Sequence, residues 1–302
     1  MTKKVVAVVV TYNRKKLLEE CINALLMQTY SPLDILIIDN ASTDGTNKLV
    51  AEFSNSRVKY VNTGKNLGGA GGFQFGVKEA AKRNYDYLWL MDDDSIPTLG
   101  ALSTLMDTAS NINEFGFLCS KVLWKDKSIC KMNIPKVSLN KKLKDFDGEP
   151  KRIIMGTFVS FLVPLKIVKE VGLPIKEFFI WADDLEYSRR ISRKYKCYFV
   201  PNSIIIHKSP SNVGSSIVND TPQRFNRYKC AYRNEVYVYR REGLAGWNHL
   251  FLKIILHLIR VAFQAKDHKK ERLHIIINAT KDGLHFHPQI EYLKDNVNHN
   301  DY

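Results

Sequence analysis

The sequence has little that would mark a secreted, zinc-binding or membrane-spanning protein. Its five cysteines are scattered and form no C-x-x-C pair, so they predict neither a disulfide framework nor a zinc site. Residues 1–10 are too short and too β-branched for a secretory signal and lack a small-residue cleavage site. No run approaches the roughly 18–20 uncharged apolar residues of a membrane span. We therefore expect a cytoplasmic protein with reduced cysteines.

Positive charge, in contrast, is abundant. The net charge is +14, the basic excess lies mainly past Tyr187, and all eight histidines lie from His207 onward. Such an excess suits a phosphorylated substrate, nucleic acid or an anionic membrane surface. A hydrophobic fraction of 45% and a charged fraction of 25% are ordinary for a globular protein. The 302 residues predict one large domain or a domain with an appendage.

Apolar strand-like runs alternate with helical periodicity in the first third of the chain. The strand-like runs are residues 5–10, 35–38, 58–60 and 87–90, and helices are expected at 15–28, from 44–46 onward, and at 69–82. This alternation predicts an α/β fold with a mostly parallel, Rossmann-like sheet flanked by helices. Further regular structure is expected at 156–165, 178–181, 198–200 and 204–206. Because helical character begins after about Asp220, we expect one domain over 1–220 and a helical, basic C-terminal region over 221–302.

Polar residues follow three of the apolar runs. They are Thr11-Tyr12-Asn13-Arg14, Asp39-Asn40 and Asp92-Asp93-Asp94. Ligands of parallel sheets bind outside the carboxyl ends of the strands, so all three groups are expected at one rim.

The triplet Asp92-Asp93-Asp94 is the first candidate for chemistry. Adjacent carboxylates repel one another unless a cation shares them. Oxygen ligands favour Mg²⁺ or Mn²⁺, which typically bridge phosphates. The alternative is an acidic loop in which Asp94 or Ser95 caps the next helix, but the strand-end position favours the metal site. His207 also ends an apolar run, which makes it either a third ligand or a structural histidine.

A second acidic pair, Asp183-Asp184, follows Trp181 and is expected at the N-terminus of a helix, where negative charge is favourable. Helix capping alone would explain it. A carboxylate held beside a substrate could instead deprotonate an attacking hydroxyl, worth ~10²–10⁴ in rate. Glu186 and Arg190 have i,i+4 spacing, so part of this group is expected to be structural.

The glycine-rich run at residues 66–73 is not a Walker loop, because no Gly-Lys-Ser/Thr follows. Its glycines would either let the backbone approach a ligand or form a tight turn into a helix that begins near Gly71. The two interpretations stay open.

Five segments together resemble the family 2 inverting glycosyltransferases of the GT-A fold. They are VVVTYNR from Val8, IDNASTDGT from Ile38, NLGG from Asn66, LMDDD from Leu90 and WADDLEY from Trp181. The resemblance covers about residues 4–210, and the ordered set is highly specific. It implies that the 1–220 domain binds a nucleotide sugar and catalyses its transfer.

The resemblance also implies roles for individual residues. Asp92 and Asp94 match the ends of the D-x-D motif and would contact Mn²⁺ or Mg²⁺ and the diphosphate. His207 matches a histidine that completes the metal site, and Asp184 matches the general base. Asp39 would face the pyrimidine N–H. The whole donor-binding set would be Thr11, Tyr12, Asn13, Arg14, Asp39, Asn40, Asn66, Gly69, Asp92, Asp93, Gly156, Trp181 and Asp183.

Within the family, the combination of the glycine-rich run with residues 91–94 and 181–187 is most similar to galactofuranosyltransferases, while rhamnosyltransferases share much of it. The implied reaction transfers galactofuranose from UDP-galactofuranose, or alternatively rhamnose from dTDP-rhamnose, to a saccharide acceptor. This acceptor is expected to be lipid-linked, in cell-surface polysaccharide synthesis such as that of a capsule. The long extensions of the polymerising enzymes are absent, which favours single addition. The expected location is peripheral, at the inner face of the cell membrane.

A helix is expected over residues 246–265. Its polar residues recur on one stripe and are His249, Lys253, His257, Arg260 and Gln264. The stripe would either meet anionic lipid in the membrane interface or be the only wet face of a core or dimer helix. The basic residues that follow residue 265 favour the membrane interpretation. The nearby Tyr228 and Arg233-Asn234 receive no role.

Two other classes of protein compete with this interpretation. A basic nucleic-acid-binding α/β protein would bind DNA or RNA in a salt-sensitive way, but the strongest charges at the expected site are acidic. A nucleotidyltransferase would carry a basic, glycine-rich loop after the first strand, where Thr11–Arg14 stands. We therefore expect a nucleotide-sugar donor and no nucleic acid, with a homo-oligomer left open.

Overall fold

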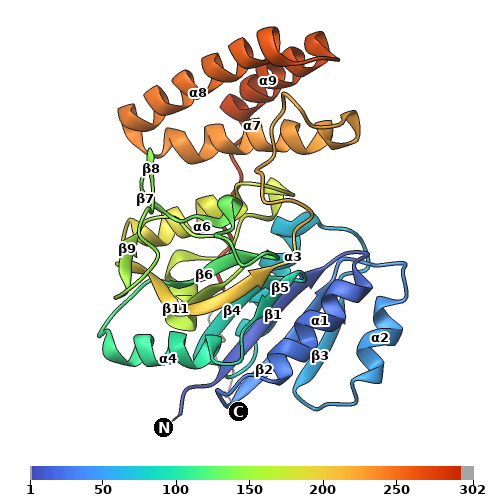
Figure 1. The fold of residues 1–302 in the computed structure, drawn as a ribbon, viewed down its shortest axis with the longest axis vertical. Helices are drawn as coiled ribbons and strands as arrows, with labels where there is room; N and C mark the ends of the chain where they lie inside the picture. The colour runs from blue at the N-terminus through green and yellow to red at the C-terminus, as the bar shows by residue number, and fades with distance from the viewer. Residues whose placement is uncertain (1, 294–302) are drawn as a thin grey trace, which may run out of the picture.

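A nine-stranded mixed sheet lies at the centre of the computed structural model, which describes residues 2–293 (Figure 1). The strand order is β3 (Val58–Asn62), β2 (Leu33–Asp39), β1 (Val5–Thr11), β4 (Tyr87–Asp92), β10 (Phe161–Pro164), β6 (Leu118–Trp124), β11 (Cys197–His207) and β5 (Ser95–Pro97), with β9 (Lys151–Ile153) also paired to β11. β1 pairs in parallel with β2 and β4, and β6 pairs in parallel with β11. The predicted α/β fold with a mostly parallel sheet is confirmed. β10, β5 and β9 are its antiparallel members.

Helices cover both faces of the sheet, which is why its central strands are apolar on both sides. Helices α1 (Lys15–Leu26), α2 (Thr46–Glu52) and α4 (Ala101–Asn111) pack on one face, and α3 (Gly68–Ala81), α5 (Leu165–Val171) and α6 (Asp183–Ser192) pack on the other. Along β1, Val5, Ala7 and Val9 face the first group, while Val6 and Val8 face the second. Each such buried aliphatic side chain contributes roughly 1.5–3 kcal/mol, so β1 anchors the sheet.

Three helices form a separate layer at one end of the molecule: α7 (Phe225–Arg240), α8 (Gly243–Gln264) and α9 (Lys269–His285) (Figure 1). α7 packs against both α8 and α9. Beyond α9 the chain returns to the sheet region, where Glu291 accepts hydrogen bonds from Gln74 and Lys78 on α3. The region past Asp220 therefore returns to contact the sheet layer through Glu291, and a boundary at 220/221 stays a prediction.

The middle of the chain differs from the expectation in two places. The lysine-rich stretch contains a short hairpin of β7 (Lys136–Ser138) and β8 (Lys141–Lys142), and Lys136 donates to the Tyr239 hydroxyl of α7 at 3.3 Å. The apolar run 178–181 is no strand. It ends the 3-10 helix Lys176–Phe178 and continues as a loop.

α8 carries its polar stripe toward the protein. Lys253 Nζ lies 2.6 Å from Glu235 of α7, and His257 Nδ1 lies 2.7 Å from the Tyr232 hydroxyl. Both sequence-based interpretations placed this stripe outward, and both are wrong for its central residues, because carboxylate and hydroxyl partners on α7 satisfy them inside the helical layer. α8 is also long and apolar enough to cross a membrane by length and composition alone. Lys253 and Arg260 interrupt its apolar residues, so α8 contains no uncharged apolar run of the length that the sequence analysis considered.

Candidate active site

The first carboxylate cluster lies where β4 ends. Asp92 is the last residue of β4, and Asp93 and Asp94 form the turn into β5. β5 pairs antiparallel with the end of β11, which sets Ser95 opposite His207. This pairing brings His207 Nε2 within 3.1 Å of Asp94 Oδ1. The next element is a strand, so the triplet does not cap a helix.

Asp92, Asp94 and His207 form a group that can hold a metal ion. Each offers a ligand atom, and these atoms all lie within 4.8 Å of one another. Two carboxylates and one imidazole suit Mn²⁺ or Mg²⁺ at a diphosphate, although imidazole is the weaker ligand for such hard ions. The residues therefore fit the cation that the sequence implied.

Asn133 orients His207, and nothing in the sequence indicated it. Its Oδ1 lies 2.8 Å from His207 Nδ1, and its own Nδ2 donates to Thr157 Oγ1 at 3.0 Å, which fixes the amide. An acceptor at Nδ1 keeps a proton there and leaves Nε2 directed at Asp94 as a ligand atom. Asn133 ends the 3-10 helix Lys131–Asn133 in a stretch without periodicity, so no pattern marked it.

The middle residue of the triplet has a different set of partners. Asp93 Oδ2 accepts from Thr11 Oγ1 at 2.8 Å, and Asp93 Oδ1 accepts from Arg14 Nη1 at 3.1 Å. Arg14 Nη1 also donates to Asp94 Oδ2 at 2.7 Å. Asp93 thus joins the end of β1 to the end of β4, while its two neighbours remain for the cation.

The pKa values of Asp92, Asp94 and His207 are shifted in different directions. Burial, and then the Asp94 charge, raise the pKa of Asp92 to about 6. Burial also acts to raise the pKa of Asp94, but His207 and Arg14 outweigh it and hold that pKa below its usual range. Burial acts to lower the pKa of His207, but its hydrogen bonds to Asp94 and Cys130 and the charges of Asp94 and Asp92 together outweigh burial and raise that pKa to about 10. A bound divalent cation would displace that proton.

The second cluster stands at the N-terminus of α6, as predicted. Asp183 is the first residue of the helix, and Asp184 Oδ1 accepts from the Leu185 amide at 2.7 Å. Burial, with a contribution from Asp92, raises the pKa of Asp184 to about 6, and burial and Asp184 raise that of Asp183 well above its usual range. The Asp92 contribution places both clusters in one electrostatic neighbourhood. A pKa near 6 suits a general base at neutral pH.

Glu186 belongs to the same helix but is structural. Its Oε2 lies 2.5 Å from Arg190 Nη2, and Arg190 also donates to the carbonyls of Val171 and Leu173. The i,i+4 pairing expected from the sequence is confirmed.

A strained loop leads into Asp183. Phe179, Trp181 and Ala182 have φ values of 61°, 64° and 65°, which side chains other than glycine rarely adopt. Asn234 of α7, fully buried, places Nδ2 within 3.2 Å of three carbonyl oxygens of this loop, those of residues 178, 180 and 181. The motif that the sequence left without a role therefore fastens this loop to the helical layer.

The glycine-rich run supports the same loop from α3, which begins at Gly68 and not near Gly71. Gly68 has φ +72°, and a Cβ there would lie 2.1 Å from the Phe179 carbonyl oxygen. A Cβ on Gly72 would lie 2.5 Å from Val10 Cγ1. These two glycines serve close packing. Gly69 has open space where a Cβ would be, so only its backbone stays free for a ligand.

Four further donor-binding candidates have different surroundings. Tyr12 is exposed at the end of β1, and Asn66 accepts from the Gly68 amide at 2.8 Å. Gly156 is buried, and a Cβ there would lie 2.3 Å from Cys119 Sγ, so packing against β6 explains this glycine. Trp181 packs edge-on against Tyr228 with ring centroids 5.0 Å apart.

The ends of β1 and β2 are tied together. Asn13 Oδ1 accepts from the Thr43 amide at 2.7 Å, and Asn40 Nδ2 donates to the Gly68 carbonyl at 2.9 Å. Asp39 is fully buried and accepts from the Ser42 amide at 2.8 Å and from the Tyr60 hydroxyl at 2.6 Å. The sequence indicated the strand of Tyr60 but not this contact.

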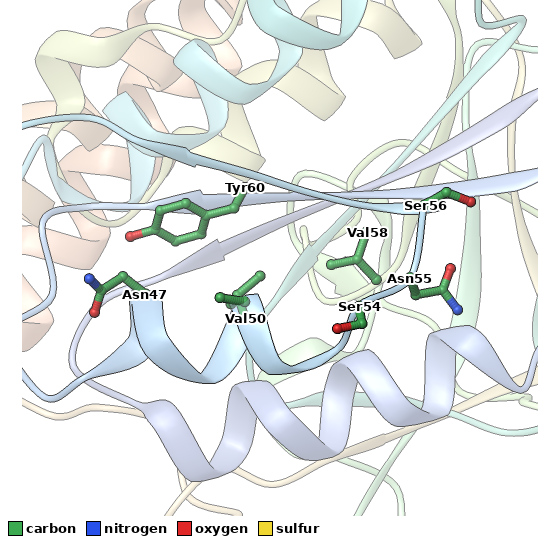
Figure 2. A pocket seen from close by; sticks show the side chains of 8 residues that line it. Asn47, Val50, Ser54, Asn55, Ser56, Val58 and Tyr60 are labelled. Carbon is green, nitrogen blue, oxygen red and sulfur yellow. The ribbon is translucent and has the colours of Figure 1, made fainter.

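Tyr60 also borders a surface hollow of about 430 Å³ between α2 and β3, where its ring lies opposite Asn47 and Val50 (Figure 2). No residue of either carboxylate cluster lines this hollow. Burial and the hydrogen bond to Asp39 raise the pKa of Tyr60 to about 12, so it stays a neutral donor. The hollow lacks the groups that group transfer requires.

Comparison with known proteins assigns the family. The model of Glycosyl transferase family 2 matches residues 6–163. This chain belongs to glycosyl transferase family 2. This membership agrees with the resemblance of the five sequence segments.

Two curated relatives illustrate the range of the family. A galactofuranosyltransferase, GlfT1, of Mycolicibacterium smegmatis is 27% identical over 209 residues, which are 64% of this chain and 66% of the relative. The chain thus spans slightly less than two thirds of that relative. A GalNAc(5)-diNAcBac-PP-undecaprenol β-1,3-glucosyltransferase of Campylobacter jejuni is 33% identical over 110 residues, 35% of each chain.

Solved structures confirm the GT-A fold. GalNAc-T7 with UDP, GalNAc and Mn²⁺ superimposes with a TM-score of 0.59 at 17% identity, over 81% of this chain and 51% of that one. At this identity the likeness concerns the fold alone.

Proposed function

We propose that this glycosyltransferase transfers galactofuranose from UDP-galactofuranose, with inversion, to a saccharide acceptor. The observation that carries the proposal is the convergence of Asp92, Asp94 and His207 within 4.8 Å, with Asp184 held in the same neighbourhood. The choice of sugar is supported by the similarity to GlfT1, which is named a galactofuranosyltransferase.

The proposed donor site uses the rim of the sheet. Asp92, Asp94 and His207 would hold Mn²⁺ or Mg²⁺, which supplies positive charge to the departing diphosphate. The ends of β1 and β2 would surround the pyrimidine base and ribose, with Tyr12 exposed for stacking. Asp93 would act from behind by holding Arg14 and Thr11 in place.

Asp184 is the proposed base. The acceptor oxygen attacks the anomeric carbon from the face opposite the diphosphate and forms the new glycosidic bond. The bond from that carbon to the phosphate oxygen breaks, and its electron pair leaves with UDP. The acceptor proton passes to Asp184, whose pKa of about 6 leaves it mostly ionised at neutral pH.

The proposed acceptor is a lipid-linked saccharide at the inner face of the cell membrane. Support comes from the Campylobacter jejuni relative, whose name includes an undecaprenol-diphosphate acceptor. Single addition and a role in cell-surface polysaccharide synthesis remain parts of this proposal.

A donor screen tests the proposal directly. Purified protein is incubated with UDP-galactofuranose, UDP-galactopyranose or dTDP-rhamnose, with Mn²⁺ or EDTA, and release of UDP or TDP is measured with a synthetic lipid-linked acceptor. We expect turnover with UDP-galactofuranose and Mn²⁺ and at least a tenfold loss in EDTA, since the carboxylates alone repel the diphosphate. Turnover with dTDP-rhamnose alone would identify a rhamnosyltransferase. Full activity in EDTA would contradict the metal assignment.

A further inference from the structure

The outer face of α8 is apolar over the whole length of the helix. Leu244 and Phe263, near its two ends, are 90% and 82% exposed, and Phe251 between them is 62% exposed. The α8 apolar face consists of Leu244, Trp247, Phe251, Leu252, Ile255, Leu256, Ile259 and Phe263. A contiguous surface of this kind is rare on soluble monomers and marks an interaction site.

This orientation is held by specific contacts and is not a loose packing of the helix. The Lys253–Glu235 ion pair and the His257–Tyr232 contact hold the polar stripe against α7, and the ring of His249 lies 4.6 Å from that of Tyr239. If α8 rotated to bury its apolar face, Glu235 would lose its cation. If α8 spanned a membrane, the same pair would be left in lipid, so the helix is expected to stay on α7.

Charge around the face indicates what covers it. α8 contains no Asp or Glu along its described length. Arg260 is exposed on α8, and Lys266, Lys269 and Lys270 are exposed just beyond it. In a symmetric pair of such faces these cations would repel one another, whereas anionic lipid headgroups would neutralise them.

We propose that the α8 apolar face lies in the interface of an anionic membrane, with its apolar side chains among the acyl chains and Arg260 and the Lys266–Lys270 cations at the headgroups. α7 lies between α8 and the Phe179–Ala182 loop, so the membrane would be reached through the same layer that holds the proposed base. Given the proposed function, this placement would bring a lipid-linked acceptor to the site.

Vesicle flotation of the full chain, without donor or acceptor, tests the membrane proposal independently of the sugar. The vesicles are phosphatidylcholine alone or mixed with phosphatidylglycerol. The test variant is Phe251→Glu with Phe263→Glu, and the matched control is Met27→Glu with Leu99→Glu, two exposed apolar residues in the sheet domain. We expect wild type and control to float with phosphatidylglycerol vesicles. The test variant should bind at least roughly tenfold more weakly, and high salt should weaken the wild type.

Two measurements keep the outcome decisive. Circular dichroism and thermal unfolding of the test variant should match the wild type, because both side chains already face solvent. Light scattering measures the mass of the protein in solution and so distinguishes a monomer from a dimer. Failure of the wild type to float, or equal flotation of wild type and test variant, would overturn the proposal. A wild-type dimer that the test variant converts to monomer would also overturn it and assign the face to a second copy.

Discussion

The two carboxylate clusters are held in opposite ways. Asp94 of the first cluster is surrounded by side chains that carry or donate protons, Arg14 and His207. Asp183 and Asp184 of the second cluster begin α6, where Asp184 accepts the Leu185 amide, and the loop before them is fastened by Asn234. The first arrangement is suited to exchanging a proton for a cation. The second keeps a carboxylate poorly solvated with a raised pKa, which suits proton transfer.

Replacing the proposed base should have the largest effect. Asp184→Asn removes the proton acceptor but keeps the shape, so we expect kcat to fall by ~10²–10⁴. UDP binding with Mn²⁺, measured by calorimetry, should stay within a few-fold of the wild type. Glu186→Gln is no suitable control because of its ion pair, whereas Asp183→Asn should lose less than Asp184→Asn. Near-normal transfer by Asp184→Asn would refute the base assignment.

The second largest effect is expected when the Asn234 hydrogen bonds to the loop before Asp183 are removed. Asn234→Leu removes the side-chain donor that the carbonyls of residues 178, 180 and 181 share, and a base displaced by about 1 Å can cost ~10²-fold in rate. We expect kcat to fall by about that factor while the affinity for Mn²⁺ is unchanged, because Asn234 does not contact the first cluster. A variant that loses metal affinity and kcat together would indicate general unfolding.

Asn133 holds a residue of the first cluster in place, as Asn234 holds the loop before the second. Asn133→Leu removes the acceptor that orients His207, so we expect Mn²⁺ affinity to drop roughly 10- to 100-fold. At saturating Mn²⁺, kcat should recover most of its wild-type value. Asn133 and Asn234 thus form a reciprocal pair of variants. If both changed the same parameter, the division of labour between the clusters would be wrong.

The smallest effect is the dependence on pH. The pKa of Asp184 is raised to about 6, so the base becomes protonated as the pH falls through that value. At saturating Mn²⁺, log kcat/KM should decline by about one per pH unit below about 6 and be flat above it until another group titrates. Persistence of this acid limb in the residual activity of Asp184→Asn would assign it to another residue.

Much of the site could be predicted from the order of apolar runs. Thr11, Asp39 and Asp92 each end a run of buried residues, and parallel strands bring their carboxyl ends to one rim. The contact of His207 with Asp94 was harder to predict, because it depends on the antiparallel pairing of β5 with β11. Asn133 lies in a stretch without periodicity and Asn234 lies inside a helix, and for both only packing reveals what the amide contacts.

The sequence by itself determined the α/β fold and the position of the first acidic cluster, because strand periodicity and strand-end polarity are local properties of the chain. The family was implied by the resemblance of five segments. Tertiary structure decided how the Asp92–Asp94 triplet divides, with Asp93 directed to β1 and the other two grouped with His207. It also decided which face of α8 is outside. A helical stripe in a sequence separates two faces, but only the partners on α7 determine which of them is turned to the protein.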